Sequence, residues 1–379
     1  MVNEMNKTKV CYIVSNIHKS LAFEWIASGL DKRFQLEFIL LNPSSSPLEE
    51  FLKNLGVPIK RITYRGKKDF ISACFKTVSY LSSSRPKIVH AHLLDAQLVG
   101  LGAARLVGIR SRIYTRHTSN FHHVYHPKGV LLDRLSNRLA TQIISISQAT
   151  DITLFQLEQV PKSKVKKIPH GFDLKVFSDV PFERINLLKK KWNIGEGRPV
   201  VGVIARQIEW KGVQFIIPAF AKLMNEYPNA QLVLANATGP YHQNILELLK
   251  YIPRDRVVLI PFEEDIAALY PTFDLYVHVP TDPLSEAFGQ TYVESLAAGV
   301  PSVFTLSGVA AEFIEADKNA VVVNYKNEDS IYHALTRLLN DDNLRKNIVV
   351  NGRRDVFSRF QMKDMIYALE KLYDEQPIV

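Results

Sequence analysis

The chain has 379 residues, which exceeds what one hydrophobic core of ordinary size holds and suffices for two α/β domains. A content of 46% hydrophobic, 10% aromatic and 22% charged residues excludes a disordered, collagen-like or disulfide-scaffold chain. Cys11 and Cys74 are the two cysteines, so there is no Cys-x-x-Cys pair for a zinc ribbon, and a reducing compartment is indicated. Because no apolar stretch approaches the ~20 residues of a membrane span, we expect a cytoplasmic protein.

The net charge of +9 is unevenly distributed along the chain. Residues 1–180 hold 26 Lys and Arg against 13 Asp and Glu, whereas residues 181–379 hold 21 against 25. The asymmetry has two interpretations. Either the first half meets an anionic partner such as nucleic acid, a membrane surface or an acidic substrate, or its surface is merely well solvated.

Short Val- and Ile-rich runs alternate with longer amphipathic stretches in both halves, which predicts parallel sheets with crossover helices. The strands expected in the first half are residues 10–15, 35–40, 88–92, 112–115, 142–146 and 165–168. After a charged helical stretch, the strands expected in the second half are residues 200–205, 231–235, 257–260, 275–279, 302–305 and 321–323. The pattern predicts an α/β protein with two Rossmann-like doubly wound domains that join near residue 180 and face each other across a cleft. Ligands of such sheets bind at the carboxyl ends of the strands.

The segment SEAFGQTYVESLAAGVPSV, Ser285 to Val303, predicts a strand-to-helix loop that turns at Gly289. The N–H groups and dipole at a helix start can hold a phosphate without a charged side chain. Glu286 precedes this helix, and Glu294 lies roughly 7.5 Å beyond Gly289 at ~1.5 Å per residue. A bound diphosphate would have a carboxylate on either side to accept hydrogen bonds from sugar hydroxyls. The alternative is two solvent-facing glutamates on an ordinary βα unit.

A second candidate set follows the first strand of the second half. Arg206 ends the buried run VVGVIAR, and Lys211-Gly212 opens the next helix after a short loop. The donor fork of Arg and the compact charge of Lys together suit a diphosphate leaving group. Taken alone, the two residues are equally consistent with ordinary surface cations.

These two segments carry a family resemblance. Arg206 with Trp210-Lys211-Gly212, and the Glu-x7-Glu run inside EAFGQTYVESLAAGVPSV, resemble family 4 of the retaining nucleotide-sugar glycosyltransferases, which have the two-domain GT-B architecture. IPHGFD, at residues 168–173, and DRVVLIPFEEDIAALYPTFDLYVHVP, at residues 255–280, are similar to further family segments. The resemblance is nearly continuous from about residue 165 to about residue 325 and looser before it.

The resemblance implies an acceptor-side domain over residues 1–180, a nucleotide-sugar-binding domain over 181–360, and a helix at 361–379 that crosses back onto the first domain. The implied reaction moves a hexose-type sugar, with its anomeric configuration retained, to a hydroxyl of a glycan or lipid-linked acceptor. Such reactions serve bacterial cell-surface polysaccharide, lipopolysaccharide or glycolipid synthesis. UDP is preferred to GDP as the donor nucleotide on family frequency.

Residue roles follow from the same resemblance, position by position. Arg206 and Lys211 would bind the donor diphosphate, Glu294 the nucleotide ribose and Glu286 the transferred sugar. His117 would lie beside the donor sugar and the reactive carbon, so that His117, Glu286, Arg206 and Lys211 are the expected catalytic residues. The other implied contacts are the backbone N–H groups of Phe288, Gly289 and Gln290, with Phe262 and Ile266 near the base.

The sequence departs from the family pattern at three places. Residues 15–20, SNIHKS, replace the Gly-Gly loop that contacts donor and acceptor, and residues 236–240, NATGP, keep only the later Gly-Pro of a Gly-x-Gly-Pro turn. His170 stands where the family has Asn, and we expect it to support the linker. His90 and His92 are expected to support the edge of the sheet.

The cations and the helix start could stabilise charge on the departing phosphate without a metal, and the sequence has no convincing Asp-x-Asp motif. We therefore expect neither a metal nor another cofactor. The same residues bear on three other functions. A retaining hydrolase needs carboxyls ~5 to 5.5 Å apart across the scissile bond, which suits two glutamates flanking a phosphate site poorly. A nucleotide-sugar epimerase on the same fold stays open, whereas a nucleic-acid-binding module lacks a recognisable motif, so no nucleic-acid partner is expected.

The excess positive charge of residues 1–180 falls on the acceptor side of the implied architecture. A basic run from Lys53 onward is interleaved with Phe51, Ile62, Tyr64 and Phe70. We expect it to contact a phosphorylated acceptor or the anionic inner face of the cell membrane, as a peripheral protein would. The residues expected on the acceptor or membrane side are Asn16, Lys60, Arg61, Arg65, Lys67 and Lys68.

Overall fold

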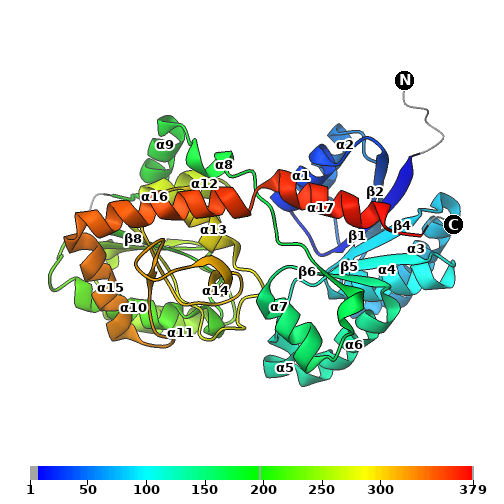
Figure 1. Cartoon of the computed structure of the whole chain (residues 1–379). Helices are drawn as coiled ribbons and strands as arrows, with labels where there is room; N and C mark the ends of the chain where they lie inside the picture. The colour runs from blue at the N-terminus through cyan, green and yellow to red at the C-terminus, as the bar shows by residue number, and fades with distance from the viewer. Residues whose placement is uncertain (1–6, 196–197, 378–379) are drawn as a thin grey trace. The chain divides into compact units, whose positions relative to one another are not determined.

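The computed structural model describes residues 7–195 and 198–377 and divides them into two compact units (Figure 1). One unit contains the described residues up to Phe172 together with those from Met362 onward, and the other runs from Asp173 to Gln361. Each unit has one sheet, and every paired strand in it is parallel. The prediction of an α/β protein with two Rossmann-like sheets is confirmed.

The first unit has a seven-stranded sheet in the order β3-β2-β1-β4-β5-β6-β7. Its strands are β1 (Thr8–Ser15), β2 (Phe34–Asn42), β3 (Ile59–Thr63), β4 (Ile88–His92), β5 (Ser111–Thr115), β6 (Gln142–Ser145) and β7 (Val165–Lys167). Its helices are α1 (Leu21–Gly29), α2 (Pro47–Asn54), α3 (Phe70–Ser84), α4 (Leu94–Leu106), α5 (Phe121–Tyr125), α6 (Val130–Leu139), α7 (Gln148–Ile152) and α17 (Met362–Asp374). The side chains of β1 are buried because β2 and β4 flank it, so Val10 to Val14 read as a continuous apolar run.

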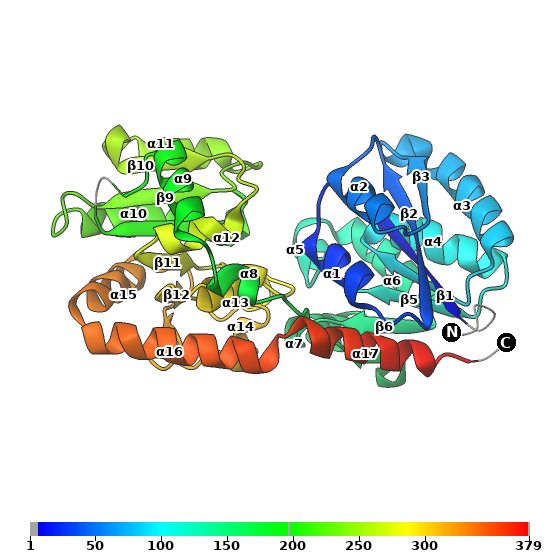
Figure 2. The same cartoon turned by 90° about the horizontal axis from the view of Figure 1, so that it is seen from above.

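The last helix, α17, lies beside α1 in both views of the chain (Figures 1 and 2). Its apolar residues recur at helical spacing, and Met365, Ile366 and Leu369 are buried. The hydroxyl of Tyr373 forms hydrogen bonds with Tyr12 at 2.5 Å and with His90 Nδ1 at 2.7 Å. These bonds tie the end of the chain to the middle of the first sheet.

The second unit has a six-stranded sheet in the order β10-β9-β8-β11-β12-β13. Its strands are β8 (Val200–Ile204), β9 (Gln231–Ala235), β10 (Val257–Ile260), β11 (Leu275–His278), β12 (Ser302–Phe304) and β13 (Val321–Val322). Its helices are α8 (Lys175–Ser178), α9 (Phe182–Trp192), α10 (Val213–Leu223), α11 (His242–Leu249), α12 (Ile266–Leu269), α13 (Gln290–Ala297), α14 (Ala310–Phe313), α15 (Glu328–Asn340) and α16 (Asp342–Arg359). No helix in the described part of the chain is long and apolar enough to cross a membrane.

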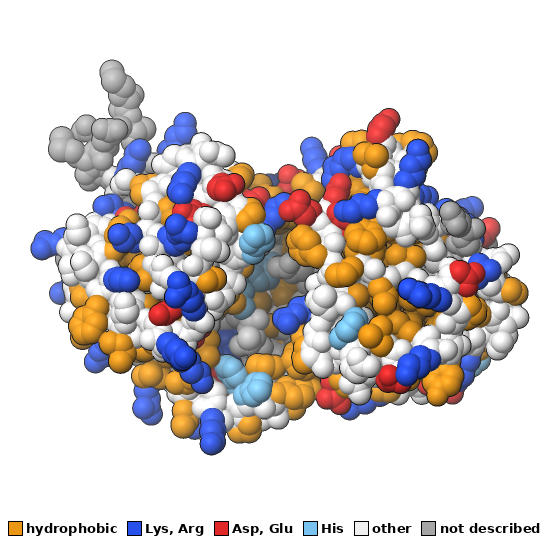
Figure 3. Space-filling model, turned by 180° about the vertical axis from the view of Figure 1, so that it is seen from behind, with side chains coloured by type: hydrophobic (Ala, Val, Ile, Leu, Met, Phe, Trp, Pro, Cys, Tyr) orange, Lys and Arg blue, Asp and Glu red, His pale blue; other side chains and the backbone are white. Residues whose placement is uncertain are grey.

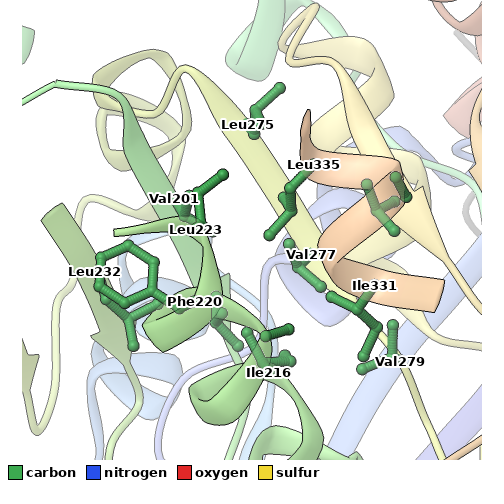
Figure 4. Packing of buried hydrophobic residues seen from close by; sticks show 14 of the residues in the cluster. Val201, Ile216, Phe220, Leu223, Leu232, Leu275, Val277, Val279, Ile331 and Leu335 are labelled. Carbon is green, nitrogen blue, oxygen red and sulfur yellow. The ribbon is translucent and has the colours of Figure 1, made fainter. Parts of the chain in front are cut away.

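The core of the second unit lies between this sheet and α10 and α15 (Figure 4). Ile216, Phe220 and Leu223 recur at three- and four-residue spacing on α10, so they share one face of the helix and are buried. On α15, Ile331 and Leu335 belong to the same cluster. This packing positions the carboxyl ends of the strands, and the loops that follow β8, β10 and β11 carry the candidate residues of this unit.

Candidate functional site

The helix start predicted at Gly289 is present. Gly289 has φ +85° and caps α13, and a Cβ built on it would lie 2.5 Å from Cε2 of Tyr292, so the turn requires glycine. Gly308 packs as tightly from the facing loop, since its Cβ would lie 2.6 Å from the carbonyl oxygen of Phe288. The first turn of any helix presents N–H groups that lack carbonyl partners within the helix. The loop therefore has the form of an anion-binding turn.

Lys211 and Glu286, which lie 75 residues apart in the sequence, form an ion pair in the structure. Lys211 Nζ lies 2.5 Å from Glu286 Oε1, and Nε2 of His278 lies 3.1 Å from the same oxygen. Burial alone would raise the pKa of Glu286, but the charge of Lys211 and the hydrogen bond from His278 outweigh it and lower that pKa to about 2. Glu286 is therefore an ionised carboxylate held between two groups.

The backbone after β8 explains how Lys211 reaches this position. Gly212 has φ +74°, and a Cβ on it would lie 1.9 Å from the carbonyl oxygen of Val279, directly after β11. The N–H of Thr281 donates to the carbonyl of Trp210 at 3.0 Å. The two loops are thus packed backbone against backbone, which brings Lys211 to the end of β11.

Glu294 lies in a different environment from Glu286. Tyr270 donates a hydrogen bond from its hydroxyl to Glu294 Oε2 at 2.7 Å, and no described cation forms an ion pair with Glu294. Burial raises the pKa of Glu294 to about 7, and the bond from Tyr270 only partly opposes this rise. Near neutral pH this carboxyl can therefore both donate and accept hydrogen bonds.

The other residues predicted for the donor side lie on the loops after β8 and β10. Arg206 follows β8 and is exposed, and Phe262 follows β10 with 61% of its surface exposed. Ile266 is half-buried and begins α12, whose first turn is capped by the side chain of Asp265. Gln290 is exposed at the start of α13, whereas Phe288 is buried. These residues share a sheet edge with Lys211 and Glu286, because β8, β10 and β11 are parallel members of one sheet.

In the first unit, His117 belongs to a cluster of imidazole rings. Its Nε2 lies 3.0 Å from Nδ1 of His92, and its ring stacks on that of His170 with centroids 5.5 Å apart. His90 lies next to His92 and is held by Tyr373 and, at 2.8 Å, by Thr115. His90, His92 and His170 were predicted to support the sheet edge and the linker, and the structure also places His92 and His170 in direct contact with His117.

The contact between His92 and His117 favours one tautomer. Burial lowers the pKa of His117 to about 3, so its ring is neutral and carries one N–H. Nε2 of His92 is buried and has no partner among the described residues. A buried N–H without an acceptor is rarer than an unused acceptor, so the proton of His92 is best placed on Nδ1, donating to His117. His117 then holds its own proton on Nδ1 and can donate it to a ligand.

The loop after β1, which has Asn16 where family members have a Gly-Gly pair, is stabilised in another way. Asn16 takes φ +51°, a left-handed conformation that asparagine tolerates. The side chain of Asn42 accepts from the N–H of Ile17 at 3.0 Å and donates to the carbonyl of Ile17 at 2.7 Å. The loop after β1 is therefore held by a side chain from the end of β2.

The basic residues predicted for the acceptor or membrane side begin on β3, an edge strand of the first sheet. Lys60 and Arg61 lie on this strand, and Arg61 is 3.5 Å from Glu49, which also pairs with Lys53 at 2.6 Å. The other predicted cations, Arg65, Lys67 and Lys68, are exposed between β3 and α3. Ile62 and Tyr64, which were expected to interleave with these cations at the surface, are instead buried in the core because strand residues alternate between faces.

Three contacts of the candidate residues are not predicted by the sequence. Tyr270 and His278 hold the two glutamates, and His92 contacts His117. None of these partners is adjacent in sequence to the group that it holds. Only the strand ending at His278, which the pattern predicts, could have suggested a polar residue at the ligand-binding edge. Among the described residues, no group of three or more His, Cys, Asp or Glu side chains is arranged to hold a metal ion.

Two Rossmann-like parallel sheets of these strand orders define the chain as a GT-B protein. It belongs to the family 4 glycosyltransferases. The family model described as Glycosyltransferase Family 4 matches residues 26–176, and the model described as Glycosyl transferases group 1 matches residues 185–355. The suspected family is thus confirmed, and the two matches together span most of the chain.

Individual relatives are distant. An uncharacterized glycosyltransferase of Methanocaldococcus jannaschii is 27% identical over 250 residues, which are 64% of this chain and 62% of that protein, less than two thirds of its length. The capsular polysaccharide biosynthesis glycosyltransferase CapM of Staphylococcus aureus is 24% identical over 315 residues, 80% of each chain. The crystal structure of Anabaena HepE in complex with UDP-glucose superposes with a TM-score of 0.83 at 21% identity and covers 97% of this chain and 99% of HepE. At that identity the likeness shows the fold.

Proposed function

We propose that the protein is a retaining glycosyltransferase that moves a hexose-type sugar from a nucleotide sugar to a hydroxyl of a glycan or lipid-linked acceptor. The observation that carries the proposal is the arrangement around Gly289, where an anion-binding turn lies between the Lys211–Glu286 ion pair and Glu294. Two similar proteins support it. HepE was crystallised with UDP-glucose, and CapM is described as acting in capsular polysaccharide biosynthesis. UDP is accordingly the proposed nucleotide, and bacterial cell-surface polysaccharide, lipopolysaccharide or glycolipid synthesis the proposed setting.

In the proposed donor complex, each charged side chain binds one part of the nucleotide sugar. Lys211 and Arg206 take the diphosphate, Glu294 accepts hydrogen bonds from the ribose hydroxyls, and Glu286 accepts from hydroxyls of the sugar. Phe262 and Ile266 offer apolar surface to the base. Glu286 also pairs with Lys211, so this carboxylate orients the lysine for the diphosphate.

The proposed chemistry stabilises the charge that grows on the departing diphosphate. Arg206, Lys211 and the start of α13 supply positive potential there, so the proposal includes no metal and no other cofactor. The acceptor hydroxyl attacks from the face that the leaving group vacates, and the β-phosphate takes its proton. His117, neutral and with its proton on Nδ1, donates to an oxygen of the donor beside the reactive carbon.

Calorimetry with UDP and GDP on single variants tests the donor assignment. Glu294→Ala and Lys211→Ala each lose one charge-assisted contact, so we expect nucleotide affinity to fall by about tenfold or more. Lys222→Ala is the matched control, because this lysine of the same unit pairs with Glu328 at the surface. Unchanged nucleotide binding by both Glu294→Ala and Lys211→Ala would rule out the assignment. The proton spectrum of the product's anomeric centre tests retention separately, since an inverted product contradicts it.

On the acceptor side we propose that Asn16 and the cluster of Lys60, Arg61, Arg65, Lys67 and Lys68 contact the acceptor. A phosphorylated or lipid-linked acceptor supplies the anionic groups that these cations would meet. The excess of Lys and Arg in the first half of the sequence supports this proposal. Lys and Arg side chains also stand out over much of the surface in Figure 3. A cytoplasmic protein that binds peripherally to the inner face of the cell membrane is the proposed location.

A further inference from the structure

Helix α6 is turned opposite to an ordinary surface helix. It buries Asp133, Ser136 and Asn137 and exposes three of its four leucines. Leu131 is 68% exposed, Leu135 44% and Leu132 39%. A surface helix normally buries its apolar stripe against the core and leaves polar residues in water. The arrangement in α6 therefore leaves apolar surface in contact with water, although folding ordinarily buries such surface.

A buried polar network fixes α6 in this orientation. Arg116 is 1% exposed and pairs with Asp133 of α6 at 3.0 Å and with Glu158 at 2.6 Å. Asn137, one turn after Asp133, donates to Glu158 at 2.6 Å and accepts from the hydroxyl of Tyr114. Turning the leucines inward would take Asp133 away from Arg116 and leave a buried charge with one carboxylate partner fewer, which is strongly destabilising. The outward face of α6 is therefore a fixed feature of the unit.

The exposed apolar residues continue onto α5, and the charges around them have one sign. We define the α5–α6 surface as the exposed residues between 124 and 138, namely Val124, Tyr125, His126, Pro127, Lys128, Leu131, Leu132, Arg134, Leu135 and Arg138. None of them is acidic, because the acidic residue of the segment, Asp133, is buried against Arg116. The surface is thus apolar and basic without compensating carboxylates.

A cavity of about 360 Å³ opens beside this surface. Arg134 and Arg138 line it together with Lys164, whose Nζ bonds the carbonyl of Asn137 at the base of α6. Glu158 also lines the cavity, but its carboxylate oxygens are already bonded to Arg116 and Asn137. Three cations around one opening form a site suited to a phosphate group.

We propose that the α5–α6 surface docks on an anionic phospholipid bilayer, with Leu131, Leu132 and Leu135 inserted at the boundary between headgroups and acyl chains. The cavity of Arg134, Arg138 and Lys164 receives the phosphate of one lipid headgroup. A helix with an apolar face flanked by Lys and Arg binds such an interface in two ways. Its apolar side chains are buried among the acyl chains, and its cations are attracted to the anionic headgroups. A second copy of the chain fits less well, since two such surfaces would bring their cations together. The proposal specifies the membrane contact of the proposed function, and its test needs no sugar donor.

Flotation of the full chain with lipid vesicles tests the proposal. The probes are vesicles of phosphatidylcholine alone and vesicles with about 30% phosphatidylglycerol, a content that gives a clearly negative surface. We expect the wild-type chain to float with the second and not with the first. Leu131→Gln with Leu135→Gln is expected to reduce the bound fraction on anionic vesicles about tenfold or more. Arg134→Gln with Arg138→Gln is expected to reduce it similarly and to flatten its dependence on salt.

The matched control is Ile71→Gln with Phe75→Gln on α3, two side chains that are 71% and 72% exposed in the same unit. We expect this variant to bind anionic vesicles as the wild type does. Failure of the wild type to bind them, or loss of binding in the control but not in the leucine variant, overturns the proposal. A wild-type dimer in sedimentation that the leucine variant dissociates also overturns it in favour of a second copy. UDP calorimetry on the same preparations shows whether the proposed function fails independently.

Discussion

Two glutamates eight residues apart have opposite pKa shifts because their partners differ. The charge of Lys211 and the bond from His278 hold the pKa of Glu286 at about 2, whereas burial beside the Tyr270 hydroxyl raises the pKa of Glu294 to about 7. One carboxyl is therefore permanently charged in the working range, and the other changes its charge near neutrality. Only the second can make ligand binding depend on pH in that range.

UDP affinity should consequently rise with pH through Glu294. In the proposed donor complex the ionised carboxylate accepts from two ribose hydroxyls above about pH 7, whereas the protonated acid has one fewer accepting site. We expect the wild type to gain several-fold in affinity between about pH 6 and about pH 8 relative to Glu294→Gln, whose amide does not titrate. Calorimetry of both chains at each pH removes the titration of UDP itself, because the two chains share it. A constant ratio of the two affinities would contradict the prediction.

At this scale the sequence allowed the prediction of Lys211, Glu286 and Glu294 but not of their protonation. The motif and its spacing point to these charged residues directly. Their pKa values depend on Tyr270 and His278, which come from other parts of the sheet and carry no local signal. The protonation of a site is a property of its neighbours in space.

At the scale of elements, periodicity predicted most strands of both sheets, but not β3. Its sequence, IKRIT, alternates apolar and charged residues as a half-exposed edge strand does, and the cations led to its interpretation as a basic surface. Helix α6 is another case. No pattern in its sequence shows that Asp133 faces inward, because the reason is Arg116 on the loop after β5.

The junction between β8 and α10 gives a prediction at the same scale. Gly212→Ala places a Cβ against the carbonyl of Val279 at φ +74°, so we expect a loss of about 1–3 kcal/mol or more in stability and weaker UDP binding. Gly102→Ala is the control, since nothing lies within 4 Å of its Cβ and it sits within α4. Alanine there should be neutral or stabilising by up to about 1 kcal/mol. Thermal melts measure the stability of both variants relative to the wild type. A Gly212→Ala chain as stable as the wild type would contradict the packing described.

For the molecule as a whole, the division into units does not follow the order of the sequence. The first unit includes α17, which comes from the other end of the sequence. Tyr373 on this helix forms hydrogen bonds with Tyr12 and His90, and its ring packs edge-on against Phe34. The sequence suggested a boundary near residue 180, and the contacts divide the chain after Phe172. The few residues between belong to α8, which packs against α12 and α13 in the second unit. Short segments of this kind have weak patterns, and tertiary packing decides where they belong.

Truncation after Gln361 should therefore destabilise the first unit selectively. The loss of α17 uncovers apolar side chains of α1 and the ring of Phe34 on β2, and it removes the hydrogen-bond partner of the Tyr12 hydroxyl. Amide hydrogen exchange should show faster exchange in β1, β2 and β4, with the second sheet unchanged. Truncation after Glu375, which keeps α17, is the control. Equal protection of the first sheet in both truncated chains would contradict this role of the helix.

The position of α17 also sets an order for synthesis. Residues 173–361 are complete as a unit before α17 has been translated, whereas the first unit begins earlier and is completed last. A nascent chain therefore carries a complete first sheet in a unit that still lacks α17, with the surface around Tyr12 and Phe34 uncovered, through the entire translation of the second unit. The part of the protein made first is the last to become fully native.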